Sequence, residues 1–243
     1  MALDRYVKRQ KTNWEIGRLY ERYLGYLWEE NEWDVTYHGA LHGFEDLGRD
    51  LICKRGNNVE IVQAKCWSAT KTIHEKHVFQ LYGTTLLYRI QNPSHVVHPV
   101  LAVTTDLSEV ALAAARELGV RVEMITLDLN YPMIKCNINQ TTGDQIYHLP
   151  FDQQYDRTKI DKRRGECYVE TIAKAEERGF MNQNDITLTL IPYLKRYLWV
   201  ATVHFPTKKT GHNRLPTTKI VSPRDKEVLF RGGDHPYNPT LRY

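Results

Sequence analysis

Two neighbouring apolar segments carry an acid, an amide and an amine where they could act together. Asp50 opens the first segment, and Gln63 and Lys65 close the second, two residues apart. Because side chains on a strand alternate between its two faces, Gln63 and Lys65 are expected to point the same way. The intervening Arg55-Gly56-Asn57-Asn58 is typical of a hairpin turn, which would return Asp50 to their side. Oxygen ligands for a hard cation beside an amine suit metal-assisted phosphodiester cleavage.

The three residues belong to a longer ordered set of motifs. In chain order these are Gly17-Arg18-Leu19-Tyr20-Glu21, Asp46-Leu47-Gly48-Arg49-Asp50-Leu51, Val62-Gln63-Ala64-Lys65-Cys66-Trp67 and Val103-Thr104-Thr105. Over residues 14–127 the set resembles the PD-(D/E)xK nuclease superfamily, in particular its Mrr-like restriction-endonuclease branch. In that branch the second acid of the motif is often glutamine, as at Gln63.

This resemblance implies a metal-dependent DNA endonuclease, acting in restriction, defence or mobile-element DNA processing. It implies that Asp50, Glu21, the Gln63 amide oxygen and the Ala64 backbone carbonyl hold Mg²⁺, for which Mn²⁺ can substitute. Lys65 would orient or deprotonate the attacking water, so the implied catalytic residues are Asp50, Gln63, Lys65 and Glu21. DNA is the implied partner. Relatives often act as dimers, so a homodimer is a further expectation, although no residue pattern here indicates one.

Other interpretations of the same residues stay open. Asp50 could be a helix cap or an ordinary surface acid, with Gln63 and Lys65 on the solvated face of an edge strand. The chain could be a DNA-binding or assembly protein built on a nuclease core that has lost catalysis, since Gln63 in place of an acid removes one negative charge from the site. It could also be a junction-resolving nuclease, specific for branched DNA.

Hydrophobic periodicity predicts the elements that must position these side chains. We predict helices over Trp14–Glu30, His74–Leu87 and Leu107–Leu118, with Asn13 capping the first and Asp106-x-x-Glu109 opening the third. We predict strands over Asp34–Tyr37, Asp50–Lys54, Val59–Cys66, Pro99–Thr104 and Val120–Ile125, and a loop over His38–Gly48. This order predicts an α/β fold with a restriction-endonuclease-like three-layer core, in which helices flank a central mixed sheet.

The remainder of the chain is expected to form a smaller α+β C-terminal region. We predict a nuclease domain over residues 1–129, a small appended module over 130–182, and a basic strand-and-loop region over 183–243, with strands at Ile186–Ile191 and Tyr197–Phe205. Cys136, His148 and Cys167 could in principle bind zinc, but they contain no closely spaced ligand pair. Structural zinc is therefore not expected.

Charge is distributed unevenly between the two halves of the chain. Residues 1–130 hold 15 Lys and Arg against 17 Asp and Glu, a net of −2, whereas residues 131–243 hold 18 against 12, a net of +6. Basic residues with interleaved aromatics suit a phosphate backbone, although a basic surface that serves solubility would look the same. As DNA contacts we predict Lys71 and Lys76, beside the expected site, and Lys208 and Lys209 in the basic half.

Two further expectations concern the cellular location of the protein and the histidines near the expected site. No apolar run reaches the roughly eighteen residues of a membrane span, and the first residues lack an apolar signal region, which favours the cytoplasm. His38, His42, His74 and His77 lie near the expected site. They could contact phosphate or act as a general acid, but solvated positions are the ordinary alternative. Gln80, one turn further along the second helix, could also face the cleft.

Overall fold

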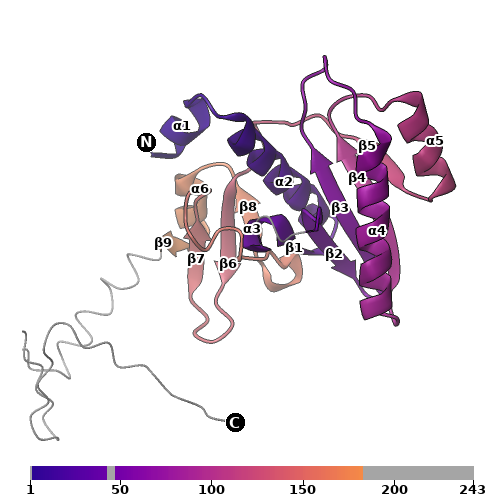
Figure 1. Cartoon of the computed structure of the whole chain (residues 1–243). Coiled ribbons are helices and arrows are strands. Elements are labelled where there is room, and N and C mark those ends of the chain that lie inside the picture. The colour runs from indigo at the N-terminus through magenta and orange to yellow at the C-terminus, as the bar shows by residue number, and fades with distance from the viewer. Residues whose placement is uncertain (1, 43–46, 183–243) are drawn as a thin grey trace, which may run out of the picture. The chain divides into compact units, whose positions relative to one another are not determined.

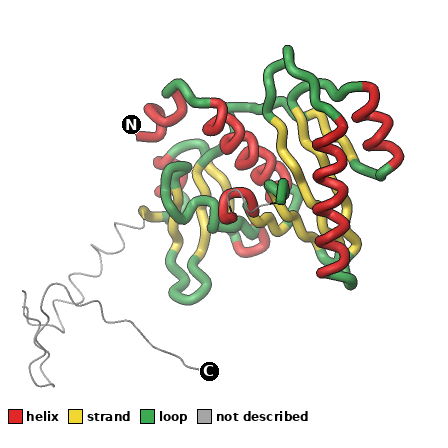
Figure 2. The backbone as a smooth tube through the Cα atoms, in the orientation of Figure 1, coloured by secondary structure: helices red, strands yellow, loops and turns green. Residues whose placement is uncertain are grey.

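The computed structural model describes residues 2–42 and 47–182 (Figures 1 and 2). The described residues belong to one compact unit, which ends at Asn182. The strands expected at Ile186–Ile191 and Tyr197–Phe205, together with Lys208 and Lys209, lie outside the described residues.

A five-stranded mixed sheet forms the centre of this unit. Its strands lie in chain order: β1 (Asp34–Thr36), β2 (Leu51–Arg55), β3 (Asn58–Lys65), β4 (Val96–Val103) and β5 (Arg121–Met124). The first three strands pair antiparallel, whereas β4 runs parallel to β3 and β5 runs parallel to β4. The expected hairpin is therefore present, with Leu51 opposite Val62 and Arg55 opposite Asn58.

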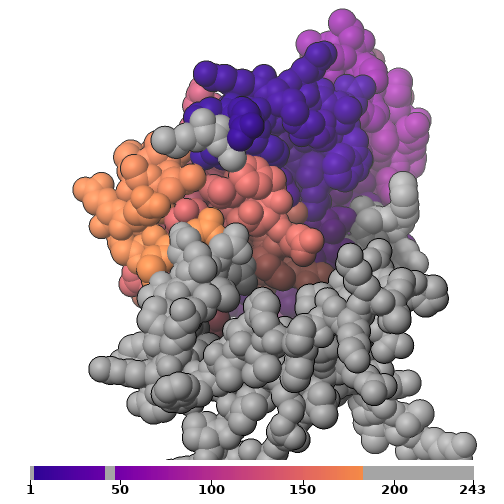
Figure 3. Space-filling view, turned by 90° about the vertical axis from the view of Figure 1, so that its left-hand side faces the viewer, coloured from indigo at the N-terminus to yellow at the C-terminus, as the bar shows by residue number. Residues whose placement is uncertain are grey.

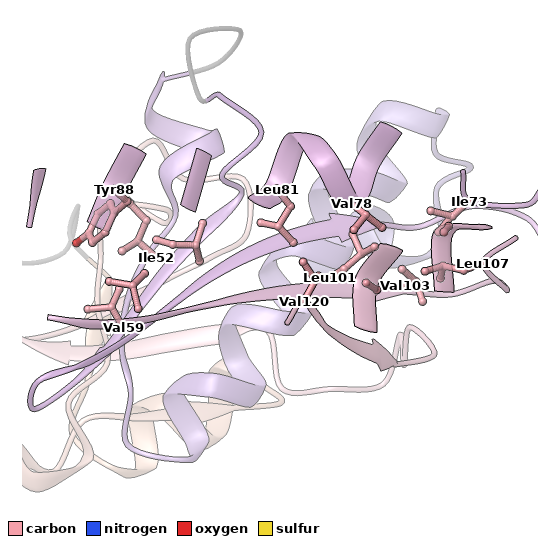
Figure 4. Packing of buried hydrophobic residues seen from close by; sticks show 14 residues of the cluster. Ile52, Val59, Ile73, Val78, Leu81, Tyr88, Leu101, Val103, Leu107 and Val120 are labelled. Atoms are coloured by element: carbon pink, nitrogen blue, oxygen red, sulfur yellow. The ribbon is translucent and has the colours of Figure 1, made fainter. Parts of the chain in front are cut away.

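Helices cover both faces of this sheet. On one face, α2 (Asn13–Glu30) packs through Tyr20 and Leu24 against Leu51, Val62 and other inward residues of the sheet. On the opposite face, α4 (Glu75–Gln91) and α5 (Glu109–Glu117) enclose a second apolar cluster, seen from close by in Figure 4. Alternation of β3 side chains between the two clusters follows the expected period of two. The predicted α/β fold, with a mixed sheet between helical layers, is confirmed.

Local predictions near the helix ends were less accurate. Thr12, not Asn13, caps α2: its hydroxyl accepts from the Glu15 backbone N–H, and the Glu15 carboxylate accepts from the Thr12 N–H, a reciprocal capping box. Helix α5 begins later than predicted, because its cap is the Ser108 hydroxyl. The expected loop after β1 begins with a short helix, α3 (His38–His42).

A second, four-stranded sheet follows within the same unit. Its spatial order is β8 (Cys167–Val169), β6 (Ile134–Ile138), β7 (Gln145–His148) and β9 (Met181–Asn182). Helix α6 (Ile172–Glu177) covers it, and Ile134, Val169 and Phe180 contribute to a separate apolar core. Two further helical segments are α1 (Ala2–Lys8) and η2 (Lys162–Arg164). Within the described ranges, no helix has the length and apolar character that a membrane crossing demands.

A buried ion pair joins helix α2 to the second sheet. The Lys135 ammonium lies 3.8 Å from the Glu29 carboxylate, and both side chains are almost fully buried. Glu29 also accepts hydrogen bonds from the Tyr168 and Tyr37 hydroxyls, and Lys135 donates to the Thr158 carbonyl at 2.7 Å. The ammonium stands over the Tyr37 ring at 4.2 Å. We call these five residues the Glu29–Lys135 cluster.

A second contact between α2 and residues 130–182 lies nearer the start of the helix. Arg22 binds both oxygens of Asp156 at 2.8 Å, and Arg18 donates to the same carboxylate at 3.1 Å. In the space-filling view of Figure 3, N-terminal residues in indigo lie directly against residues 130–182 in pink and orange. Two charged contacts therefore hold residues 130–182 to α2.

Candidate active site

The Asp50 carboxylate lies against the end of β3. The Asp50 backbone N–H donates to the Val62 carbonyl at 3.0 Å, which extends the β2–β3 pairing past Leu51. Its Oδ2 accepts from the Ala64 backbone N–H at 2.6 Å. Asp50 is thus hydrogen-bonded to the residues before and after Gln63, and the hairpin brings its carboxylate against the Ala64 backbone.

The Gln63 side chain is buried, although the sequence predicts that it is accessible at the end of the strand. Its exposed fraction is 1%. The Gln63 Nε2 donates to the Gly48 carbonyl at 3.1 Å and to the Gln80 Oε1 at 3.4 Å. The Gln63 Oε1, by contrast, is buried and has no hydrogen-bond partner among the described residues. An unmet buried acceptor typically costs about 1–3 kcal/mol, so this oxygen is an available ligand atom.

Glu21 reaches the same region from α2. Burial and then the negative charge of Asp50 raise the pKa of Glu21 to about 7, although the neighbouring Arg18 guanidinium acts in the opposite direction. Arg18 donates to the Glu21 carboxylate at 2.6 Å. The two predicted acids are therefore close enough to repel each other, and a protein cation lies beside one of them.

Lys65 follows on the same strand, near His77 of α4. Burial, followed by the positive charges of Lys65, Lys76 and His74, lowers the pKa of His77 to about 4. The ring meets Trp67 edge-on, with ring centroids 5.2 Å apart. An imidazole with this pKa is neutral at pH 7 and carries no proton to donate as a cation. This disfavours the general-acid interpretation of His77.

The predicted DNA contacts that the structure describes are exposed. Lys71 and Lys76 lie at the surface, at the start of α4 and in the segment before it. The Lys71 ammonium stands 5.9 Å from the Trp67 ring centroid.

The donor set fits a hard divalent cation in chemistry. Asp50 and Glu21 offer carboxylate oxygens, Gln63 offers an unpartnered amide oxygen, and Ala64 offers its carbonyl, all of them ligand types that Mg²⁺ accepts. No group of three or more His, Cys, Asp and Glu side chains is placed to hold a metal within the part of the chain that is described. A cation at this site would thus depend on the amide and carbonyl oxygens as well as on the two acids.

Two nearby residues escaped the sequence analysis. Arg18 lies three residues before Glu21, the spacing of an ion pair on a helix, so this contact could have been found. Gly48 adopts a left-handed backbone with φ +76°, and a Cβ there would lie 2.7 Å from Gln63 Nε2. Its role as acceptor for Gln63 left no signal in the sequence.

The residues considered for zinc have other partners. His148 Nε2 lies 3.0 Å from Asn137 Oδ1, and Cys167 accepts a hydrogen bond from Arg178 at 3.0 Å. Cys136 lies opposite Cys167 in the pairing of β6 with β8, and neither thiol forms a disulfide.

Comparison with known proteins provides little further information. No family model matches the chain, and no curated protein is detectably similar to it. A crystal structure described as a protein of unknown function, AF1548, is 17% identical with a TM-score of 0.35, covering 43% of this chain and 56% of that one. A likeness of this extent supports no inference about function. The resemblance of residues 14–127 to the PD-(D/E)xK superfamily stays a prediction.

Proposed function

We propose that this protein is a metal-dependent endonuclease that hydrolyses phosphodiester bonds in DNA. The observation that carries the proposal is at the end of the β2–β3 hairpin, where the Asp50 carboxylate accepts from the Ala64 N–H and the amide oxygen of the adjacent Gln63 is buried without a partner among the described residues. Lys65 lies two residues beyond Gln63 on the same strand. Glu21 approaches from a different element, which fits a site assembled around a shared cation.

Each residue has a distinct role in this proposal. The chemistry that Mg²⁺ would supply is charge neutralisation at the scissile phosphate. Asp50, Glu21, Gln63 and the Ala64 carbonyl hold the ion, and the hydrogen bond from Ala64 N–H fixes the direction of the Asp50 carboxylate. Lys65 orients the attacking water and stabilises negative charge on the phosphate. Lys71 and Lys76 bind the neighbouring backbone of the DNA.

The decisive experiment compares site variants with matched controls on DNA. Plasmid, linear, methylated and branched substrates are incubated with Mg²⁺, with Mn²⁺ and with a chelator. Asp50→Ala and Lys65→Ala should each abolish cation-dependent cleavage while DNA binding is retained. The control variants Asp34→Ala and Lys54→Ala change the same residue types at exposed positions of β1 and β2, and should cleave like the native protein. Cleavage that survives in both Asp50→Ala and Lys65→Ala contradicts the assignment.

One observation favours a second candidate, a DNA-binding protein on a core without catalysis. The Arg18 guanidinium pairs with Glu21 at 2.6 Å and so neutralises one of the two acids that the site needs. Salt-sensitive DNA binding, without cleavage of any substrate in Mg²⁺ or Mn²⁺, would favour this candidate. A homodimer and a cytoplasmic location, both expected from the sequence, stay predictions.

A further inference from the structure

The amide of Gln63 has only one orientation compatible with its neighbours. A backbone carbonyl can accept a hydrogen bond but cannot donate one. The Gln63 atom that faces the Gly48 oxygen at 3.1 Å must therefore be the nitrogen. Its second N–H is directed to the Gln80 Oε1 at 3.4 Å. With both hydrogens used on this side, the amide oxygen occupies the other branch, buried and unpartnered among the described residues.

The position of the Gly48 carbonyl is held by the turn before β2. Leu47 and Gly48 both adopt left-handed backbone conformations, with φ of 57° and 76°. A Cβ on Gly48 would come within 2.8 Å of the Gln80 Nε2 as well as meeting Gln63. The turn, the amide and Gln80 therefore touch one another closely, and the carbonyl has little freedom to turn away.

We infer that the pocket at position 63 selects an amide over a carboxylate, and that Gln80 is a positioning residue that keeps the amide oxygen turned towards the cation. An ionised carboxylate has no hydrogen to give to the Gly48 carbonyl, so two negative oxygens would face each other there. The residues around position 63 therefore favour glutamine over glutamate. The first half of the inference rests on the geometry of the amide alone, whereas the second half rests on the proposed function.

The first test measures stability without any divalent cation. Gln63→Glu is unfolded thermally in a chelator at pH 7, beside a control, Gln91→Glu, which adds the same charge to an exposed glutamine at the end of α4. Gln63→Glu should lower the midpoint by about 3–8 °C, and Gln91→Glu should leave it within about 1 °C of the native protein. A midpoint for Gln63→Glu equal to or above the native one overturns the selection of an amide.

The second test measures cation binding and not cleavage, with Mn²⁺ as the probe in titration calorimetry. Gln80→Leu removes the acceptor, so binding should weaken about tenfold, the usual effect of losing a group that orients a ligand. Gln80→Glu retains an oxygen that accepts from the Gln63 Nε2 and adds a negative charge near the site, so it should bind Mn²⁺ at least as tightly as the native protein. Gln91→Leu is the matched control for the loss of an amide. Equal binding by Gln80→Leu and Gln80→Glu overturns the role of Gln80.

The two tests separate this inference from the proposed function. If the native protein binds Mn²⁺ and the Gln80 variants differ as expected, yet no DNA is cleaved, the nuclease proposal fails and the inference stands. If the native protein binds no Mn²⁺, the role of Gln80 towards a cation is overturned, while the midpoint of Gln63→Glu still decides the selection of an amide.

Discussion

Two clusters of buried polar groups each include one glutamate of helix α2, Glu29 in one and Glu21 in the other, and they differ in how completely their hydrogen bonds are satisfied. In the Glu29–Lys135 cluster, the carboxylate accepts from two tyrosines and faces the ammonium, which in turn donates to a carbonyl. At the candidate site, Gln63 Oε1 and His77 Nε2 are buried without hydrogen-bond partners among the described residues. Glu21 and Asp50 repel each other there.

This difference distinguishes buried polar groups that stabilise the fold from buried polar groups that serve a function. A satisfied buried network holds two parts of a fold together and leaves nothing over for a ligand. A buried site with unmet acceptors and two like charges is costly to the folded protein, and such arrangements gather where function requires them. The comparison therefore predicts that removing a charge from the first cluster destabilises the protein, whereas removing a charge from the candidate site mainly affects activity.

The largest expected effect on stability comes from Lys135→Met. This change removes the counter-charge of a carboxylate that is itself almost fully buried, which typically costs about 3–5 kcal/mol of unfolding free energy. Urea unfolding followed by tryptophan fluorescence measures the loss. Lys159→Met is the control, because its partner Asp34 and Lys159 itself are both about half exposed, and such pairs contribute about 0–1 kcal/mol. Equal losses in both variants would remove the distinction between buried and exposed pairs.

Combining Lys135→Met with Glu29→Leu should recover much of that loss. Burial raises the pKa of Glu29 and lowers the pKa of Lys135 against their mutual attraction, so desolvation is the dominant contribution for both groups. Replacing both members of such a pair by apolar side chains is often nearly neutral. A double-mutant cycle on the unfolding free energies gives the coupling. Strictly additive losses would show that the two groups stabilise the fold independently.

Asp156→Asn should have a smaller effect, and one that depends on pH. Although burial alone acts in the opposite direction, hydrogen bonds and charge from Arg22 lower the pKa of Asp156 below its ordinary 3.8. A lowered folded-state pKa stabilises the protein above the ordinary value, and this stabilisation is lost as the pH falls through the folded-state pKa. Asp156→Asn should therefore cost roughly 1–3 kcal/mol at pH 7. The difference from the native protein should narrow below about pH 4, as followed by urea unfolding at each pH. A constant difference at every pH would contradict the ionic contribution.

The smallest effect on stability is expected at the candidate site itself. Asp50→Asn keeps an acceptor for the Ala64 N–H but removes one of two repelling charges. The unfolding free energy should stay unchanged or rise by up to about 1 kcal/mol, while cation-dependent cleavage is lost. Thermal unfolding and plasmid cleavage on one preparation test both outcomes. A strong destabilisation would place Asp50 with the structural cluster instead.

The sequence predicted those parts of the fold that depend on local residue patterns. The β2–β3 hairpin lies within one residue of its predicted bounds because turn composition and strand alternation both specify it. The α2 cap was misplaced by one residue because Thr12 and Asn13 are adjacent and both suit a cap, and only the Glu15 side chain distinguishes them.

Long-range burial was not predictable in the same way. Lysine is almost never fully buried without a partner, so nothing around Lys135 indicates that it lies against Glu29 and Tyr37. Gln63 was expected at a strand end, but its burial depends on the Gly48 turn and on Gln80 of another element. The candidate site residues were therefore identifiable one by one, while the contacts that determine their chemistry required the fold.

The buried contact between Lys135 and Glu29 has a consequence for how this chain can evolve by recombination. A segment that can be exchanged between proteins must have a core that is complete without its neighbours. Residues 130–182 do not meet this condition, because they bury the Lys135 ammonium, whose counter-ion Glu29 belongs to helix α2. Transplanting either part alone would leave an isolated charge in an apolar interior. Recombination between α2 and residues 130–182 should thus be tolerated only when both parts are exchanged together, so that the two sheets are inherited as one unit.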